Sequence, residues 1–216
     1  MQRTLAVPAV AMGNVGQLAV DALIASLCVP PSPPSHRIDS DPHLDPVVTL
    51  DPVFSRAVGI VGTPLEVFDV DETLSLLQIR SLVIAGHSKA LAERIVGWAK
   101  EHGFSRLVIM TGASALALKD DEMFATRGTA RLLSDLPELR DSRFPPCNED
   151  QLEFSGLTKH ILRAAKQASM EACALVRFVF EGDNFADGLA MAHDMITLLN
   201  REQVNIKEPA VWRTFR

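Results

Sequence analysis

The pattern of apolar and polar positions first predicts a strand that turns directly into a helix. Residues 5–12 are apolar throughout, and the turn Gly13-Asn14-Val15-Gly16 follows them. Small and apolar residues then recur at three- and four-residue spacing, as on one face of a helix: Val15, Leu18, Ala19, Ala22, Leu23 and Ser26. A buried strand that turns through glycines into a helix is the basic unit of an α/β layer.

The turn itself carries candidate capping residues and part of a nucleotide-binding pattern. Asn14 is predicted to cap the helix, and Gln17, three residues later, to reach back as in a capping box. Gly13 and Gly16 leave the stretch one glycine short of the dinucleotide fingerprint G-x-G-x-x-G. The acidic residue expected about 20 residues further on would fall in a proline-rich stretch. We therefore interpret the two glycines as architectural, with a ligand-binding turn as the alternative.

Further along the chain, apolar runs alternate with helical patterns. Ser88 is predicted to cap a helix that stops at Gly103, and between residues 115 and 148 the pattern assigns no element. The predicted elements are a hairpin of strands at 65–69 and 73–85, a helix from 88 with Leu91, Ile95 and Trp98 on its inner face, a strand at 107–110, a helix at 157–167, a strand at 172–180 and a helix at 185–199. This alternation predicts an α/β sandwich around a mixed, mostly parallel sheet.

A proline-rich segment interrupts the alternation. Residues 30–52 hold seven of the 13 prolines of the chain. Because proline lacks a backbone N–H, this segment cannot supply a helix or a central strand. We expect a single α/β domain over residues 1–216, with a Pro-rich insert at about 30–46.

Composition and charge exclude several classes of function. The chain has 216 residues, of which 47% are apolar and 22% charged, enough apolar material for one core. The net charge of −6 argues against a nucleic-acid surface. No apolar run reaches the roughly 18 residues of a membrane-spanning helix. The three cysteines fit neither a disulfide framework nor a zinc pattern, which favours a reducing compartment, the cytosol or the nucleus.

Ser114 is the candidate nucleophile of the chain. The stretch 112–115 follows a buried strand and resembles the hydrolase motif G-x-S-x-G, with alanine in the last place. Asp135 or Asp183, with His160 or His193, would complete a triad in chain order. Both histidines fall within predicted helices, whereas the hydrolase histidine normally lies on a loop. We therefore predict no catalytic residue, and the remaining histidines lack metal-ligand spacing.

A second polar turn, Glu181-Gly182-Asp183-Asn184, follows a later strand. Its two carboxylates lie at the end of that strand, where α/β proteins bind ligands. The simpler interpretation is that Asp183 or Asn184 caps the next helix and Gly182 makes the turn. The sequence thus predicts no cofactor and no metal.

Several of these stretches together resemble one family. Residues 7–21, VPAVAMGNVGQLAVD, resemble the opening segment of the PAC2 family of proteasome assembly chaperones, in which a Pro-Ala-Val strand runs into Gly-Asn-Val-Gly-Gln-Leu-Ala. Residues 77–81, LQIRS, are similar to the family's Leu-Gln-Leu-Arg-Ser strand, and residues 178–184 match its Phe-Val-x-Glu-Gly-Asp-Asn block. Further counterparts occur in the same order at Trp98, 157–159 and Trp212-Arg213. The likeness spans most of the chain.

The resemblance implies a fold, a function and partners. The fold would be a three-layer sandwich like that of nucleoside phosphorylases. The protein would be a non-enzymatic chaperone of the cytoplasm and nucleus, without a cofactor. It would form a heterodimer with proteasome assembly chaperone 1, bind proteasome α subunits and help the α ring of the core particle to form. The alternative is an α/β hydrolase or a nucleoside phosphorylase-like enzyme that uses Ser114 or the Gly13–Gly16 turn.

Partner contacts are predicted at the C-terminal end. Trp212, Arg213 and Phe215 are the expected interface residues, because buried aromatic side chains often dominate binding energy. Some chaperones of this type dock through a C-terminal hydrophobic-Tyr-x tail, but this chain has no tyrosine and ends Thr214-Phe215-Arg216. Either Phe215 partly replaces that ring, or docking falls to the partner subunit. The high apolar content also predicts apolar side chains exposed on the isolated chain, as the dimer face.

Overall fold

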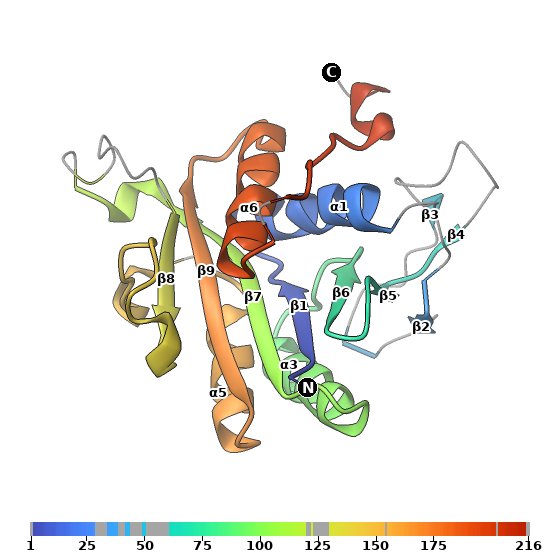
Figure 1. Ribbon diagram of the computed structural model, residues 1–216, viewed down its shortest axis with the longest axis horizontal. Helices are drawn as coiled ribbons and strands as arrows, with labels where there is room; N and C mark the ends of the chain where they lie inside the picture. The colour runs from blue at the N-terminus through green and yellow to red at the C-terminus, as the bar shows by residue number, and fades with distance from the viewer. Residues whose placement is uncertain are drawn as a thin grey trace.

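The computed structural model describes residues 2–28, 34–38, 42–43, 49–50, 61–119, 122, 130–153, 155–201 and 203–214. A seven-stranded sheet runs through the molecule (Figure 1), in the order β2 (His36–Ile38), β5 (Leu65–Asp69), β6 (Leu74–Ile79), β1 (Thr4–Pro8), β7 (Arg106–Ser114), β9 (Glu171–Val179) and β8 (Ala130–Ser134). The neighbours β6, β1, β7 and β9 are parallel, whereas β2, β5 and β8 pair antiparallel at the two sides. β3 (Thr49–Leu50) and β4 (Val61–Gly62) form a second, two-stranded sheet.

Helices cover both faces of the large sheet (Figure 1). α1 (Val15–Leu27) and α6 (Phe185–Leu198) pack together on one face, and α3 (Ser88–Glu101) and α5 (Thr158–Gln167) on the other. Short 3-10 helices lie in the connections: η1 (Met12–Asn14), η2 (Ala115–Ala117), η3 (Pro137–Leu139), η4 (Glu149–Gln151) and η5 (Ala210–Thr214). The architecture is therefore three layers, helix on sheet on helix.

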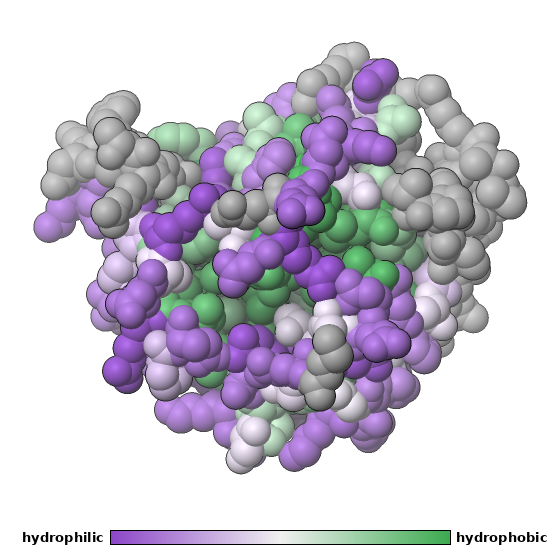
Figure 2. Space-filling model, viewed as in Figure 1, coloured by the Kyte–Doolittle hydropathy of each residue, from purple (hydrophilic) through white to green (hydrophobic). Residues whose placement is uncertain are grey.

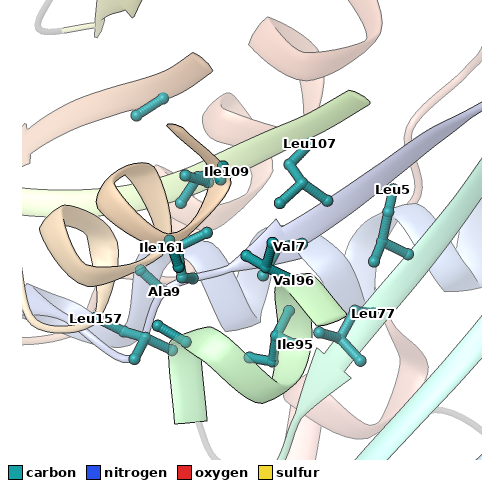
Figure 3. Packing of buried hydrophobic residues seen from close by; sticks show 14 of the residues in the cluster. Leu5, Val7, Ala9, Leu77, Ile95, Val96, Leu107, Ile109, Leu157 and Ile161 are labelled. Atoms are coloured by element: carbon teal, nitrogen blue, oxygen red, sulfur yellow. The ribbon is translucent and has the colours of Figure 1, made fainter. Parts of the chain in front are cut away.

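Alternation along the central strands builds two hydrophobic cores. In β1, Leu5 and Val7 belong to the core beneath α3 and α5, and Ala6 between them belongs to the core beneath α1 and α6. Figure 3 shows the first core, where side chains of β1, β6 and β7 meet those of α3 and α5. A parallel strand covered on both faces needs apolar residues at successive positions. This requirement explains the continuous apolar runs of the sequence.

The face that carries α1 and α6 is polar at its rim. In the space-filling view of this face, hydrophilic residues prevail along the coloured part of the outline, and hydrophobic residues are visible near the centre (Figure 2). Within the described ranges, no helix combines the length and apolarity needed to cross a membrane.

The structure confirms the predicted α/β class and corrects several local predictions. Ser88 is the first residue of α3 rather than its cap, because His87 holds the N-cap position and no side chain makes a capping bond there. The second hairpin strand ends at Ile79, not at residue 85, and β7 extends to Ser114 rather than stopping at 110. β8 lies in the range that the pattern left unassigned.

The Pro-rich insert contributes one described strand to the sheet. β2 pairs with β5 at the edge, with His36 opposite Val67. An edge position suits such a segment, because proline cannot donate to a central ladder. Residues 29–33, 39–41 and 44–48 lie outside the described residues, so the extent of the insert stays a prediction.

A charged contact ties the hairpin turn to the segment after α6. Asp71 accepts hydrogen bonds from Arg201 Nη1 at 2.6 Å and from Thr73 N at 2.8 Å and Oγ1 at 2.7 Å. The hydrogen bond from Arg201, together with those from Thr73, lowers the pKa of the Asp71 carboxyl group below its usual value. The turn between β5 and β6 and the C-terminal third of the chain are thereby held together.

Acid should weaken the chain partly through Asp71. Because its pKa is lowered on folding, the unfolded chain binds more protons near and below a pH of about 4, the range of an unperturbed Asp. Stability from this group is present above that range and is lost as the pH falls through the folded pKa. We expect urea titrations to show a shallower acid loss of unfolding free energy for Asp71→Asn than for the unmodified chain. Glu72→Gln, an exposed carboxylate of the same turn, is the control and should keep the original slope.

Because α1 packs closely on the sheet, replacing Gly16 by a larger residue should lower the stability of the fold. A Cβ atom at Gly16 would lie within 3.0 Å of the Met110 carbonyl oxygen, whereas one at Gly97 in α3 would meet open space. Gly16→Ala is therefore expected to lower the free energy of unfolding by about 1–3 kcal/mol, as overpacking does. Gly97→Ala should raise it by about 0.5–1 kcal/mol, since glycine is costly inside a helix. Denaturant titration of both variants measures the difference, and equal stabilities would contradict the packing described.

Candidate functional site

Three of the stretches singled out in the sequence meet at one edge of the sheet. The Gly13–Gly16 turn follows β1, Ser114 ends β7, and residues 182–184 follow β9. Because β1, β7 and β9 are parallel neighbours, their carboxyl ends lie side by side. Ligands of α/β proteins usually bind at this edge.

Backbone fills the corner where α1 meets β7. A Cβ atom on Gly16 would approach the carbonyl oxygen of Met110, and one on Gly112 would approach the carbonyl oxygen of Met12, both within 3.0 Å. The N–H of Ala9 also donates to the Met110 oxygen at 2.8 Å. The segment after β1 therefore lies directly along β7, backbone against backbone.

Two more glycines close the corner from the sides of α5 and β9. Gly156, just before α5, would place a Cβ within 3.0 Å of the carbonyl oxygen of Val10. Gly13 has a φ of +65°, and a Cβ there would lie 2.6 Å from Nδ2 of Asn184. A nucleotide-binding turn uses its glycines to let a phosphate approach the backbone. In this corner, protein atoms occupy that space, which supports the architectural interpretation of Gly13 and Gly16.

The predicted capping box at the start of α1 is wrong. Asn14 has a φ of 52°, in the left-handed region, and its side chain makes no capping bond. An N-cap needs an extended backbone, which this residue has lost. The Gln17 side chain does not reach back to Asn14. Its Nε2 donates to the backbone carbonyl oxygen of Ile79 at 2.9 Å, and the backbone carbonyl oxygen of Gln17 accepts from Gln78 Nε2 at 3.0 Å. Gln17 therefore joins α1 to β6.

A buried charged cluster beside the corner was missed in the sequence. The Arg80 side chain is only 6% exposed; its Nε lies 2.7 Å from Glu66 Oε2 and its Nη1 lies 3.0 Å from Asp21 Oδ1. Asp21 also accepts from Gln78 Nε2 at 2.7 Å. The sequence offered one signal for this cluster: Asp21, Glu66 and Arg80 each lie within an otherwise apolar stretch. Because both carboxylates are held by Arg80, they fix α1 to the β5–β6 hairpin instead of offering a free acid or base.

A small hollow opens next to this cluster. It has a volume of about 210 Å³ and is lined by Asn14, Gln17, Leu18, Asp21, Gln78, Ile79 and Arg80. Sites for small molecules usually enclose roughly 300–1,000 Å³. The hollow is therefore too small to be a substrate site of the usual kind.

The turn after β9 is closed by its own side chains. Asp183 Oδ1 accepts from the N–H of Phe185, the first residue of α6, at 3.2 Å. Asn184 occupies the N-cap position but makes no capping bond; its Nδ2 donates to the carbonyl oxygens of Phe180 and Gly182, each at 3.1 Å. Of the two predicted caps, Asp183 binds the start of the helix and Asn184 instead holds the turn that Gly182 forms.

The structure does not assemble a catalytic triad around Ser114. Its Oγ accepts from the N–H of Leu116 at 3.3 Å, which closes the turn into η2. His160 lies on α5 and His193 on α6, on opposite faces of the sheet. Asp135 follows Ser134, the last residue of β8. Because β8 is antiparallel to β9, Ser134 pairs with Cys173, near the amino end of β9. Of these candidates, Asp183 alone follows a strand at the same edge as Ser114, and among the described residues no hydrogen bond joins the Ser114 hydroxyl to any of them.

Cysteine and metal chemistry find no support in the described part of the chain. Cys28, Cys147 and Cys173 are buried, and burial raises the pKa of the first two thiols to about 11 and of the third to about 12. Thiols with such a raised pKa are poor nucleophiles at neutral pH. Among these residues, no group of three or more His, Cys, Asp or Glu side chains could hold a metal ion.

The C-terminal segment packs on its own chain. Trp212 in η5 is only 2% exposed, and its ring lies 4.9 Å from that of Phe185 at the start of α6. The N–H of Lys207 donates to Oγ of Ser26 in α1 at 2.8 Å. Of the three predicted interface residues, Trp212 is thus an internal anchor and Arg213 is exposed, whereas Phe215 lies outside the described residues. Contact of these residues with a partner stays a prediction.

Relatives from several animals that match most of this chain carry the same name. A proteasome assembly chaperone 2 from Xenopus laevis is 27% identical, over 97% of this chain and 90% of its own length. One from Nematostella vectensis is 28% identical, over 94% and 93%, and the human one is 25% identical, over 87% and 78%. Among solved structures, Pyrococcus furiosus PbaA, an archaeal homologue of proteasome-assembly chaperone, superposes with a TM-score of 0.70 at 13% identity, over 99% of this chain and 87% of that one.

The family follows from the extent of the match. The sequence profile of the PAC2 family matches residues 5–183, which include the Gly13–Gly16 turn, the Arg80 cluster and the turn after β9 up to Asp183. The fold of PbaA agrees with the three layers described above. The chain therefore belongs to the PAC2 family.

Proposed function

We propose that this chain is a proteasome assembly chaperone that pairs with proteasome assembly chaperone 1 and binds proteasome α subunits. In this role it helps the α ring of the core particle to form and blocks wrong associations. The relatives that match over most of the chain carry the name proteasome assembly chaperone 2. They are chaperones rather than enzymes, and we assign this chain to the same class.

The filled corner at the carboxyl edge carries the proposal. An α/β enzyme of the phosphorylase or hydrolase type needs an open site there with converging polar groups. Here three glycines bring backbone against backbone and a fourth, Gly13, lies against the Asn184 side chain. The adjacent hollow is small, and the nearby carboxylates are held by Arg80. These observations favour a protein that acts through its outer surfaces, without turnover of a substrate.

Reconstitution tests the proposal directly. The purified chain, mixed with proteasome assembly chaperone 1 of the same organism, should elute in size exclusion as a heterodimer and should gain thermal stability, because a partner that binds only the folded chain stabilises it. Adding single α subunits should shift the heterodimer into a larger complex. Separate elution of the two chaperones at micromolar concentration, with unchanged melting temperatures, would contradict it.

Ser114 should have no catalytic role. A fluorophosphonate probe, which labels activated serines, is expected to leave the chain unlabelled at neutral pH, because no His, Asp or Glu side chain among the described residues forms a hydrogen bond with the Ser114 hydroxyl. Ser114→Ala should form the heterodimer as well as the unmodified chain does. Labelling that disappears in Ser114→Ala would revive the hydrolase alternative.

The two described C-terminal candidates should separate folding from binding. Trp212→Ala removes a buried aromatic side chain and is expected to cost about 3 kcal/mol of unfolding free energy. Arg213→Ala removes an exposed charge and should leave the free energy of unfolding within about 0.5 kcal/mol. Because Arg213 is a predicted interface residue, the same change should weaken α-subunit binding. Denaturant titration and a binding isotherm for each variant measure the two effects. A stable Trp212→Ala chain would contradict the anchor that we assign to this ring.

A further inference from the structure

Exposed apolar side chains gather at the carboxyl edge of the parallel strands. Among the residues that the structure describes, the large hydrophobic side chains that stand exposed are Leu82 (64%), Leu116 (82%) and Phe180 (57%). They follow the last residues of β6, β7 and β9, which are Ile79, Ser114 and Val179. These three strands and β1 are successive, parallel neighbours in the sheet, in the order β6, β1, β7 and β9. The three side chains that follow their last residues therefore lie along the same edge.

The loops that carry Leu82 and Leu116, and the segment that follows β1, are apolar as a whole. Residues 9–12, 82–85 and 115–118 read AVAM, LVIA and ALAL, without a charged residue. Val10, Val83 and Ala117 are half-buried and pack on the core beneath α3 and α5, so the edge continues that core toward the surface. The ligand-binding loops of α/β enzymes are rich in polar groups at this place. An apolar edge of this kind points to contact with another protein.

The charged residues next to the edge indicate which kind of protein would bind there. Glu181 and Asp183 are exposed directly after Phe180, and the whole chain carries a net charge of −6. Two copies that paired symmetrically through this edge would bring the same carboxylates into one interface. Like charges across an interface oppose association, whereas Lys and Arg on a different partner would favour it. The two carboxylates outnumber the exposed Lys119 that follows loop 115–118, so the charges favour a hetero-partner over a second copy.

We propose that the carboxyl edge, defined by Leu82, Leu116 and Phe180, is the surface on which the partner chaperone docks, through an apolar face flanked by Lys or Arg. This assignment rests on the proposed pairing with proteasome assembly chaperone 1. The edge spans three inter-strand spacings, about 14 Å, while a stable interface buries about 800 Å² on each partner. The three side chains thus form the apolar centre of the contact, and Glu181 and Asp183 belong to its rim.

Charge placed in the centre of this surface tests the proposal. Leu116→Glu and Phe180→Glu should each weaken binding of purified proteasome assembly chaperone 1 at least tenfold in calorimetry or interferometry. Both side chains are exposed, so the melting temperature of the isolated chain should stay unchanged. Gln167→Glu is the matched control: it adds the same charge at an exposed position at the end of α5, near the amino end of β9, and should bind as the unmodified chain does.

The rim is tested by reversing its charge. Glu181→Lys combined with Asp183→Lys should weaken binding at low salt. The affinity of the unmodified chain should fall as salt is added, and that of the double variant should fall less. An affinity that responds equally to salt in both proteins would show that these carboxylates do not face basic groups.

The outcomes separate this surface from the pairing itself. If the unmodified chain binds proteasome assembly chaperone 1 and both Glu variants bind within twofold of it, the surface assignment is overturned and the pairing stands. If the unmodified chain does not bind that partner, both are overturned. Loss of α-subunit binding with intact pairing would place α subunits on the edge, and a homodimer that Leu116→Glu dissociates would place a second copy there; either result overturns the proposal.

Discussion

The structure depends on backbone packed against backbone at one corner of the sheet. Segment 9–16 lies along β7 with the carbonyl oxygens of Met110 and Met12 against Gly16 and Gly112. A side chain at Gly16 would push α1 away from β7, and one at Gly112 would push η1 away from it. The separation between helix and sheet, and with it the packing of α1 on α6, is set by this contact. The same contact removes the space that a phosphate or substrate would need.

Close packing at the corner leaves its polar side chains engaged with other parts of the fold. Polar groups near the corner are used inside the fold: Arg80 binds two carboxylates, Gln17 joins α1 to β6, and Asn184 closes a turn. A buried ion pair of this kind adds little net stability but is costly to break, so it fixes the relative position of the hairpin and α1. Three large apolar side chains stay exposed at the carboxyl edge, beside the carboxylates Glu181 and Asp183. A surface of this composition is typical of contacts between proteins.

The sequence predicted the layers better than the details of the turns. Apolar runs and helical periods located the main strands and helices, because burial on both faces imposes those patterns. Capping was predicted less well: Asn14 and Ser88 have the right residue types, but the backbone at Asn14 is left-handed and α3 begins at Ser88 itself. β8 was missed because a five-residue edge strand carries little periodic signal. The Arg80 cluster could not be predicted, since its three charged residues come from separate elements and meet only after folding.

Hydrogen–deuterium exchange of the free chain and of its complex with proteasome assembly chaperone 1 tests the account most directly. The amides of the corner, at Ala9 and Gly16, should exchange slowly already in the free chain, because backbone covers them. The amides of loops 82–85 and 115–118 should exchange fast in the free chain and become protected in the complex. A complex in which these loops keep their fast exchange, or a free chain with a rapidly exchanging corner, would contradict the account.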